Sequence, residues 1–211
     1  MRRVLRDYPE ISVNPQTITG PIDFKQIFGR QGHVHVEIGS GNGTFLLNQA
    51  QSLPEIDFLG IEWANKYYKY AVDRIGRWGL KNVRIIRTDA AVFISDYIPD
   101  SSVDCFHIYF PDPWPKKRHH KRRFICPANI EQMIRCLVNA GIIQIATDHL
   151  DYFEQMKICF AEKHEVLEQI DFIPSAGACE SEFAGTNYER KYIKENRKVY
   201  TIAVRKACFT A

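Results

Sequence analysis

The sequence has no paired cysteines and no long apolar runs. Its six cysteines, at positions 105, 126, 136, 159, 179 and 208, include no C-x-x-C pair and no companion histidines at zinc spacing. This predicts reduced thiols and no bound metal. No stretch approaches the roughly 20 apolar residues that a membrane-spanning helix requires, and the opening MRRVLRDYPEISVNP has acids and prolines where a signal peptide has its apolar segment. We therefore expect a cytoplasmic protein with no membrane partner.

The chain also lacks internal repeats, low-complexity tracts, an obvious linker and a large net charge, which is only +3. Its basic character is local, because six of the 28 lysines and arginines fall within residues 116–123. A length of 211 residues with 45% hydrophobic content suits one α/β domain with a full core. We expect an N-terminal segment over residues 1–30 and one domain over residues 31–211, present as a monomer or homodimer.

Short apolar runs alternate with helix-like segments, the pattern of βα units around a parallel sheet. The predicted strands cover residues 33–39, 57–62, 83–89, 103–110 and 142–148. The predicted helices cover residues 44–53, 64–79, 90–98, 128–141 and 152–163. Residues 197–206 look like one strand of a hairpin. The fold class is therefore α/β, with a mostly parallel sheet and a C-terminal antiparallel hairpin.

Acidic residues recur where the predicted strands end. Glu62, Asp89, Asp112 and Asp148 follow four strands, and the first strand ends at Gly39. A single such acid more often caps a helix, and this alternative stays open for Asp89 and Asp148. Ligands of open α/β sheets bind at the carboxyl ends of the strands, so four acids after a glycine loop favour a shared site.

The loop VEIGSGNGTF contains the glycine pattern of a nucleotide-binding turn, with Glu37, Gly39 and Gly41. The nicotinamide fingerprint G-x-G-x-x-G fails because Thr44 occupies its last position. Glu62 follows at the spacing of an acid that accepts hydrogen bonds from ribose hydroxyls, and Asp89 could accept from a purine amine. Glu37 precedes the glycines, at the edge of the sheet where the cofactor would bind. An acid there favours S-adenosylmethionine, which carries an ammonium and a sulfonium, over a dinucleotide, whose pyrophosphate it would repel.

Five motifs then resemble, in order, the bacterial tRNA (guanine-N7-)-methyltransferase family. They are the glycine loop, GIE at 60–62, FPDPWPKKRHHKRR at 110–123, ATDH at 146–149 and TNYERKY at 186–192. The resemblance spans about Val36 to Tyr192. It implies a Rossmann-like methyltransferase domain that moves the methyl group of S-adenosylmethionine to N7 of the guanine at position 46, in the variable loop of tRNA.

The resemblance also implies roles for individual residues. The implied cofactor-binding residues are Glu37, Gly39, Gly41, Glu62, Asp89 and Asp112. Asp112 is also the implied catalytic residue. The implied substrate contacts are Lys116, Asp148, Thr186, Asn187, Tyr188 and Glu189.

Chemistry narrows the role of Asp112. Guanine N7 has an in-plane lone pair and no proton at neutral pH, so the reaction needs orientation rather than a general base. We therefore expect Asp112, stiffened by the prolines around it, to orient guanine and stabilise the positive charge that develops on the ring.

Other residues near this motif have alternative roles. Trp114 stacks on the base or packs the loop. Tyr188 packs on the guanine site or belongs to the core. The predicted phosphate contacts are Lys117, Arg118, Lys121, Arg122 and Arg123.

Three other functions compete with this interpretation. The D-P-W-P loop is similar to the N-P-P-Y loop of amino methyltransferases, but a small amine has no use for six cations. A non-catalytic RNA-binding subunit would not need all four acids of the cofactor edge. A nicotinamide oxidoreductase is the weakest alternative because its glycine fingerprint is broken.

Overall fold

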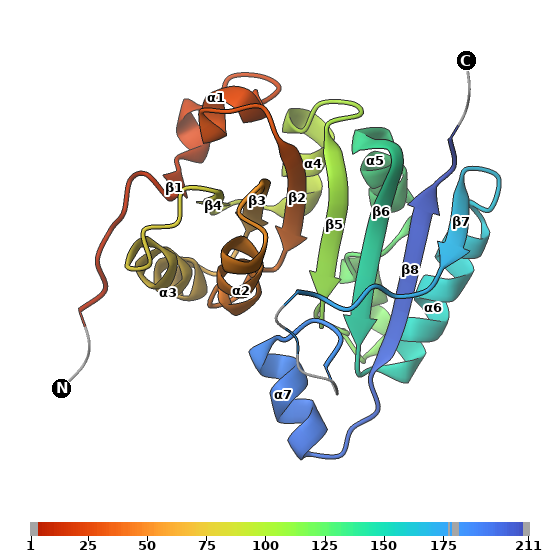
Figure 1. Cartoon of the computed structure of the whole chain (residues 1–211). Coiled ribbons are helices and arrows are strands. Elements are labelled where there is room, and N and C mark those ends of the chain that lie inside the picture. The colour runs from red at the N-terminus through yellow and green to blue at the C-terminus, as the bar shows by residue number, and fades with distance from the viewer. Residues whose placement is uncertain (1–3, 177, 179–181, 209–211) are drawn as a thin grey trace. The chain divides into compact units, whose positions relative to one another are not determined.

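Parallel strands alternate with helices through the first half of the chain, as its apolar periodicity predicts. The structure, a computed structural model, describes residues 4–176, 178 and 182–208. These residues form two compact units that divide between Pro99 and Asp100 (Figure 1). The proposed boundary at residue 30 stays a prediction. No helix in the described ranges is both long and apolar enough to cross a membrane.

The first unit is a four-stranded parallel array with the strand order β1-β4-β3-β2. Its strands are β1 (Ser12–Val13), β2 (His33–Ile38), β3 (Ile56–Ile61) and β4 (Val83–Ile86). Its helices are η1 (Pro15–Thr17), α1 (Phe24–Phe28), α2 (Thr44–Ser52), α3 (Asn65–Gly76) and α4 (Ala90–Tyr97). The βα alternation therefore brings the ends of β2, β3 and β4 to the same edge, where the predicted cofactor residues follow.

The second unit combines parallel and antiparallel pairing. β5 (Val103–Tyr109) pairs in parallel with β6 (Leu137–Thr147), and β8 (Tyr200–Lys206) pairs antiparallel with both β6 and β7 (Leu167–Ile170). Its helices are η2 (Lys117–Arg122), α5 (Pro127–Cys136), α6 (Leu150–Ala161) and α7 (Asn187–Lys194). The α/β class with mostly parallel strands and an antiparallel C-terminal pair is confirmed.

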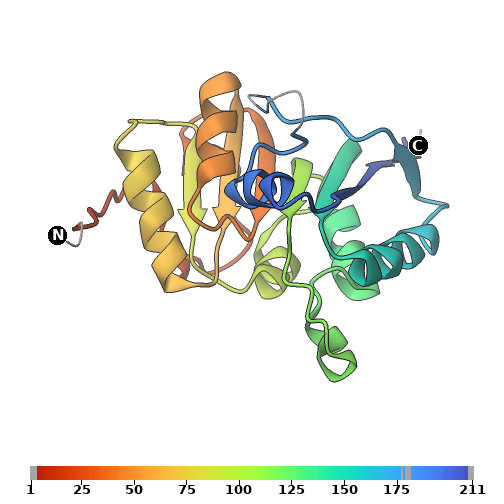
Figure 2. The ribbon, with the colours of Figure 1, turned by 90° about the horizontal axis from the view of Figure 1, so that it is seen from below.

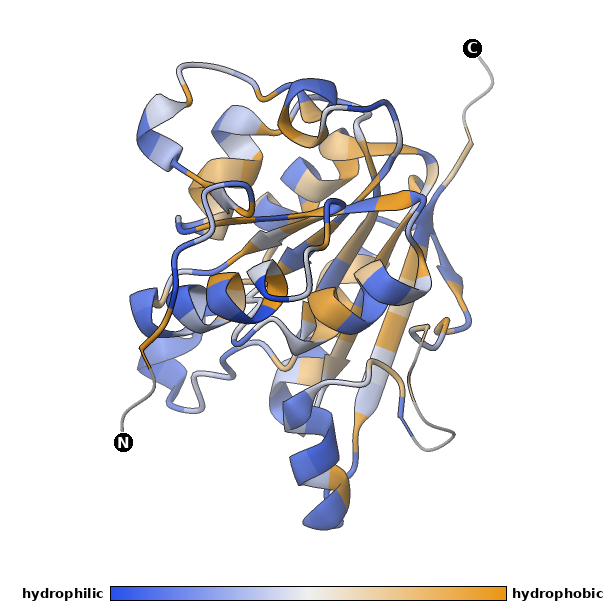
Figure 3. Ribbon diagram, turned by 60° about the vertical axis from the view of Figure 1, so that its left-hand side comes forward, coloured by the Kyte–Doolittle hydropathy of each residue, from blue (hydrophilic) through white to orange (hydrophobic). Residues whose placement is uncertain are grey.

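Each unit has its own hydrophobic core. Val36, Phe58 and Ile85 are fully or almost fully buried in the first unit, as are Phe106 and Ile143 in the second. The strands are accordingly rich in hydrophobic residues, whereas the helices mix hydrophobic and hydrophilic positions (Figure 3). Burial of these apolar side chains is the main favourable contribution to folding, and it fixes the strands that carry the site loops.

The largest differences from the sequence prediction lie in the second unit. The predicted helix over 128–141 ends at Cys136, and β6 begins at once. The register along β5 then shifts between Val103 and Cys105, and Ala140 adopts a left-handed φ of 62°. Residues 137–141, which the apolar pattern had placed in the helix, therefore belong to the irregular start of β6. The second difference is α7, which lies between β7 and β8, so the C-terminal strands are not joined by a tight turn.

Candidate functional site

The glycine loop turns sharply between β2 and α2. Gly39, Gly41 and Gly43 have left-handed φ angles of 78°, 53° and 72°, a conformation that glycine adopts without steric cost. A Cβ at Gly43 would lie 3.0 Å from the Cβ of Ala71 on α3, whereas a Cβ at Gly39 would meet nothing within 4 Å. The loop is therefore packed tightly at its helical end and faces open space at the end of the strand.

Glu62 fixes this loop from the neighbouring strand. Its carboxylate accepts hydrogen bonds from the backbone N–H of Gly41 at 2.8 Å and of Ala64 at 2.7 Å, one on each oxygen. The side chain is 8% exposed. A carboxylate has about four lone-pair sites, so each oxygen keeps capacity for a further donor. Glu62 thus joins the glycine loop to the start of α3 and can still accept from a ribose hydroxyl.

Glu37, at the end of β2, is a buried acid with one unused oxygen. Its Oε2 has no hydrogen-bond partner among the described residues. Burial raises the pKa of Glu37 to about 8; a hydrogen bond from Ser40 partly offsets this shift, and the nearby charge of Glu62 adds to it. An unpaired buried carboxyl is costly, so this oxygen marks a place where a cationic or hydrogen-bonding group can bind.

These three features fit S-adenosylmethionine. Glu37 offers a buried acceptor for an ammonium group, Glu62 retains acceptor capacity, and the backbone near Gly39 is open to a ligand. Among the described residues, neither acid is paired with a lysine or arginine that would offset its repulsion of a pyrophosphate.

Asp89 has the capping role that the sequence left open. It is exposed, three residues past the end of β4, and its Oδ1 accepts from the backbone N–H of Ala91 and Val92 at the start of α4. Its Oδ2 makes no contact within the described ranges. A role in cofactor binding would therefore use Oδ2.

Asp112 lies on a strained loop of the second unit. Phe110 and Trp114, on either side of it, have left-handed φ angles of 52° and 44°, which bulky residues rarely adopt. The carboxylate is exposed and has no hydrogen-bond or ion-pair partner in the part of the chain that the structure describes. The ring of Phe110 packs on Tyr192 at 5.3 Å between centroids, which anchors the start of the loop.

Trp114 packs within the loop itself. The Arg122 guanidinium lies 4.9 Å from the centre of its ring, and His119 meets the ring edge-on at 5.9 Å. The structure therefore gives Trp114 the packing role of the two that the sequence allowed. Its ring orders the basic segment that follows.

The basic segment forms η2 at the tip of a projecting loop (Figure 2). Five cations in and beside it are exposed: Lys116, Lys117, Arg118, Lys121 and Arg122. Apart from Arg122 on Trp114, these side chains make no contact with the rest of the described chain. Five like charges held at one tip are a natural contact for a polyanion.

Arg123 differs from its neighbours and is 3% exposed. It donates to the backbone oxygen of Pro113 at 2.9 Å, to Gln155 Oε1 at 2.7 Å and to the carboxylate of Asp151, and it lies 4.8 Å from the Tyr152 ring. The guanidinium is thus occupied by the protein, which departs from the predicted phosphate contact. We reassign Arg123 as the residue that holds the Asp112 loop to α6.

Asp148 is not a helix cap. Its carboxylate forms an ion pair with Arg197, and the adjacent His149 caps α6 by accepting from the backbone N–H of Tyr152. Arg197 also lies 4.3 Å from the centre of the Tyr192 ring, whose pKa is raised by burial and by the charge of Asp148. A substrate that binds Asp148 would share it with Arg197 or displace Arg197.

The predicted substrate residues of the TNYE segment begin α7. Thr186 caps the helix by accepting from the backbone N–H of Glu189, and Glu189 is fully buried. The Glu189 carboxylate accepts from three consecutive backbone N–H groups, those of residues 183–185. Both residues therefore shape the chain here, whereas Asn187 and Tyr188 remain exposed.

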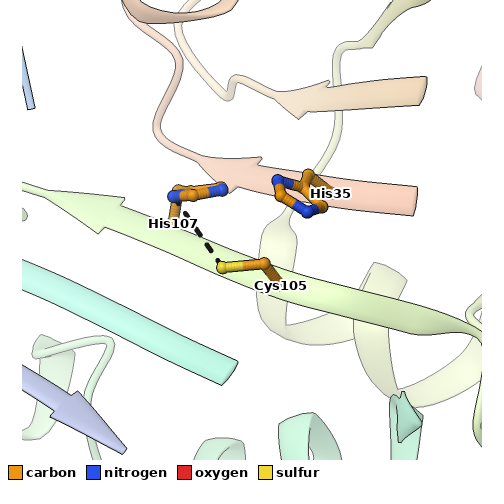
Figure 4. A group of neighbouring side chains, drawn as sticks. All are labelled: His35, Cys105 and His107. Atoms are coloured by element: carbon orange, nitrogen blue, oxygen red, sulfur yellow. Dashed lines mark hydrogen bonds between the residues drawn. The ribbon is translucent and has the colours of Figure 1, made fainter. Parts of the chain in front are cut away.

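Cys105 and His107 lie side by side on β5 (Figure 4). The Cys105 sulfur is 4.0 Å from His107 Nδ1, which lies 2.8 Å from the Tyr109 hydroxyl. Burial raises the pKa of Cys105 well above its usual value, so the thiol stays neutral and is a poor nucleophile. The five described cysteines are free thiols, and Cys179 lies outside the described residues.

Sequence reasoning missed three residues of the second unit: Arg197, Asp151 and Gln155. Each makes its contact with a residue at least 28 positions away in the chain. Such contacts leave no local pattern. Only the position of Arg123 at the end of the basic run hinted that it could face inwards.

The chain matches a known family along most of its length. Residues 31–202 match the family described as "Putative methyltransferase". A tRNA (guanine-N(7)-)-methyltransferase of Nitrosococcus oceani is 44% identical over 68% of this chain and 61% of its own length. Proteins of the same name from Streptococcus thermophilus and Thermotoga maritima are 31% and 34% identical, over 94% and 93% of this chain and 92% and 62% of their own lengths.

Solved structures share the fold. A SAM dependent methyltransferase from Aquifex aeolicus superposes with a TM-score of 0.54 at 13% identity, over 86% of this chain and 85% of that protein. A SAM-dependent O-methyltransferase from Thermotoga maritima gives 0.55 at 14% identity, over 90% of this chain and 68% of that protein. The Rossmann-like methyltransferase fold predicted from the sequence is confirmed.

Proposed function

We propose that this chain, which belongs to the tRNA (guanine-N(7)-)-methyltransferase family, methylates the guanosine at position 46 in the variable loop of tRNA. Membership of this family supports S-adenosylmethionine-dependent methylation of guanine N7 in tRNA. The position within the tRNA rests on the motifs around Asp112. We further propose that the enzyme works in the cytoplasm as a monomer or homodimer.

The observation that carries the proposal is the Asp112 loop. It presents one exposed carboxylate, unpaired within the part of the chain that the structure describes, on a strained backbone, and five exposed cations follow directly. A loop that only connected two elements would gain nothing from the strain or from five unpaired like charges. A loop that orients a base within a polyanion needs both features.

The first unit would hold the cofactor. Glu37 would accept from its ammonium group, and Glu62 from its ribose hydroxyls, while Gly39 and Gly41 let the backbone approach it. Asp89 would contribute through Oδ2. S-adenosylmethionine, when bound, supplies an electrophilic methyl group on a sulfonium.

Asp112 would orient the substrate. Guanine presents the N1–H and the 2-amino group as donors, and a carboxylate accepts both. The ring gains positive charge as N7 is alkylated, so a fixed carboxylate stabilises the transition state more than the ground state. Because N7 carries no proton, Asp112 need not act as a base. The strained backbone and Arg123 hold it in place for this role.

The remaining predicted contacts would bind the RNA around the base. Lys116 and the exposed cations of η2 would neutralise phosphates. Asp148, Asn187 and Tyr188 would contact the nucleotide, with Thr186 and Glu189 shaping the backbone that presents them.

The test is transfer of labelled methyl groups to unmodified tRNA, compared with the same tRNA carrying adenine at position 46. We expect transfer to the first and none to the second. Mapping the product as N7-methylguanosine identifies the atom. Equal incorporation into both tRNAs would refute the assigned position, and no incorporation into either would refute the proposed activity.

A further inference from the structure

A second basic surface lies on the first unit, on the outward side of α3. A hollow of about 400 Å³ is lined there by Lys66, Tyr67, Tyr70, Arg74 and Arg77, together with Asn42 of the glycine loop. Its size falls in the roughly 300–1,000 Å³ range of ligand pockets. Glu37, Glu62 and Asp89 do not line it, so the hollow is separate from the acids of the cofactor edge. Asp73 of α3 also lines the hollow. We call these seven residues the α3 surface.

Helical spacing brings the side chains of this surface together. Residues 66, 70 and 77 follow one another at four and seven positions, so they form one stripe, and residues 67 and 74 lie beside it. Each of the two tyrosines is 41% exposed. Both rings therefore stay accessible where they line the hollow.

The charges of the α3 surface are mostly positive. Lys66 makes no described contact except with the Tyr67 ring, 5.8 Å away. Arg77 pairs with the buried carboxylate of Asp73, which also accepts from the backbone of Arg6. Arg74 donates to Thr44 at 2.5 Å. Asp73 is the only acid among the lining residues, and it is already neutralised.

We propose that the α3 surface binds the RNA substrate as a second contact, with a phosphate on Lys66 and an unstacked base against Tyr67 or Tyr70. This inference rests on the proposed function, since it takes tRNA as the substrate. Aromatic rings that alternate with cations are the arrangement that binds unstacked nucleotides.

A second copy of this chain is a poorer occupant. In a twofold dimer the same patch meets itself, so one positively charged patch would face another. Placing like charges opposite each other is unfavourable. A polyanion, in contrast, complements them.

The test compares the full-length variants Tyr70→Ala and Lys66→Ala with Lys25→Ala. Lys25 is an exposed lysine of the same unit that does not line the hollow. We expect the dissociation constant and KM for unmodified tRNA to rise about fivefold or more in Tyr70→Ala, the lower end of the loss when a base-stacking ring is removed. We expect a smaller rise in Lys66→Ala and less than a twofold change in Lys25→Ala. The affinity for S-adenosylmethionine and kcat at saturating tRNA should stay unchanged, which also verifies the fold.

A crosslinking measurement on the wild-type protein tests the inference even if a variant folds poorly. With the wild-type protein, tRNA carrying 4-thiouridine should crosslink to the peptide that contains Tyr67 and Tyr70. Wild-type tRNA affinity in both variants, without a crosslink to this peptide, would overturn the inference and leave the proposed function standing. Loss of a dimer in the variants would assign the surface to a second copy instead. A wild-type protein that neither binds nor methylates tRNA would refute the proposed function itself.

Discussion

The predicted cofactor acids of the first unit and Asp112 of the second unit have opposite surroundings. In the first unit, Glu62 and Asp89 are satisfied by backbone N–H groups, and Glu37 is buried. In the second unit, Asp112 is exposed and has no hydrogen-bond or ion-pair partner among the described residues, and five exposed cations without an ion pair in those ranges follow it. The first arrangement is fixed before any ligand binds. The second is left unsatisfied by the protein, and its charge is available to a substrate.

The difference suggests a division of tasks. A cofactor of constant shape can bind to groups that the fold has already positioned. A large charged substrate is better met by open charges on a supported loop, because exposed charges attract it from a distance. Substitutions of the predicted cofactor acids in the first unit should therefore change cofactor binding, whereas substitutions in the Asp112 loop should change turnover and RNA binding.

The largest effect is expected for Asp112→Asn. We expect kcat to fall about 100-fold or more, because an amide cannot stabilise positive charge on the guanine ring. Single-turnover methyl transfer measures it. The control is Asp171→Asn, which changes an exposed aspartate of the same unit outside the motifs and should keep wild-type turnover. Turnover near wild type in Asp112→Asn would refute the charge part of the mechanism.

Arg123→Met tests whether the loop needs its support. Loss of the contact with the Pro113 oxygen should let the Asp112 loop shift, and kcat should fall about 10- to 100-fold, since small misplacements at a reacting centre are costly. The affinity for S-adenosylmethionine should not change. Arg123→Lys keeps the charge and one donor, so it should restore part of the turnover. If turnover in Arg123→Met falls only in proportion to the loss of folded protein, the residue has no positioning role.

Glu37→Gln tests the buried acid through its pH dependence. The pKa of Glu37 is about 8 in the folded protein, and an ordinary carboxyl titrates near 4.3 when unfolded. Between these values the unfolded state has lost the proton and the folded state has kept it, so stability falls as pH rises. We expect a loss of about 2 kcal/mol between pH 6 and 8, and Glu37→Gln should abolish this fall in urea titrations.

The same substitution should weaken the binding of S-adenosylmethionine. Binding of its ammonium group favours the ionised carboxylate, so wild-type affinity should strengthen as pH rises from 6 towards 8, accompanied by proton release. In Glu37→Gln we expect affinity to fall about tenfold at pH 8 and to lose this dependence. Calorimetry in two buffers of different ionisation enthalpy measures both quantities. Unchanged binding would remove Glu37 from the cofactor site.

The smallest effect is expected for single cations of η2. The five exposed cations in and beside η2 should contribute at most roughly −3.5 to −4.5 to the slope of log K against log salt. Lys121→Ala should reduce its magnitude by about 0.7 to 0.9 and weaken tRNA binding a few-fold. Arg123→Met should leave the slope unchanged, because that guanidinium is buried. If the salt slope fell equally in both variants, Arg123 would be a phosphate contact as the sequence predicted.

Much of the fold could be predicted from the sequence, because alternating apolar runs encode strands and helices locally. The glycine loop, Glu62 and the Asp112 loop were also found from their motifs. The sequence could not predict that Arg122 is exposed whereas Arg123 is buried. They are adjacent and chemically identical, and only the carbonyl of Pro113 and the side chains on α6 decide that one faces inwards. For the same reason, no local pattern indicated that Arg197 would pair with Asp148.

The left-handed backbone at Phe110 and Trp114 has a consequence for protein engineering. Each such residue costs about 1–3 kcal/mol of folding free energy, and glycine at either position would recover part of it. The same substitution would remove a ring that packs on Tyr192 or on Arg122, so the strain and the anchoring of the loop cannot be separated by exchanging one residue.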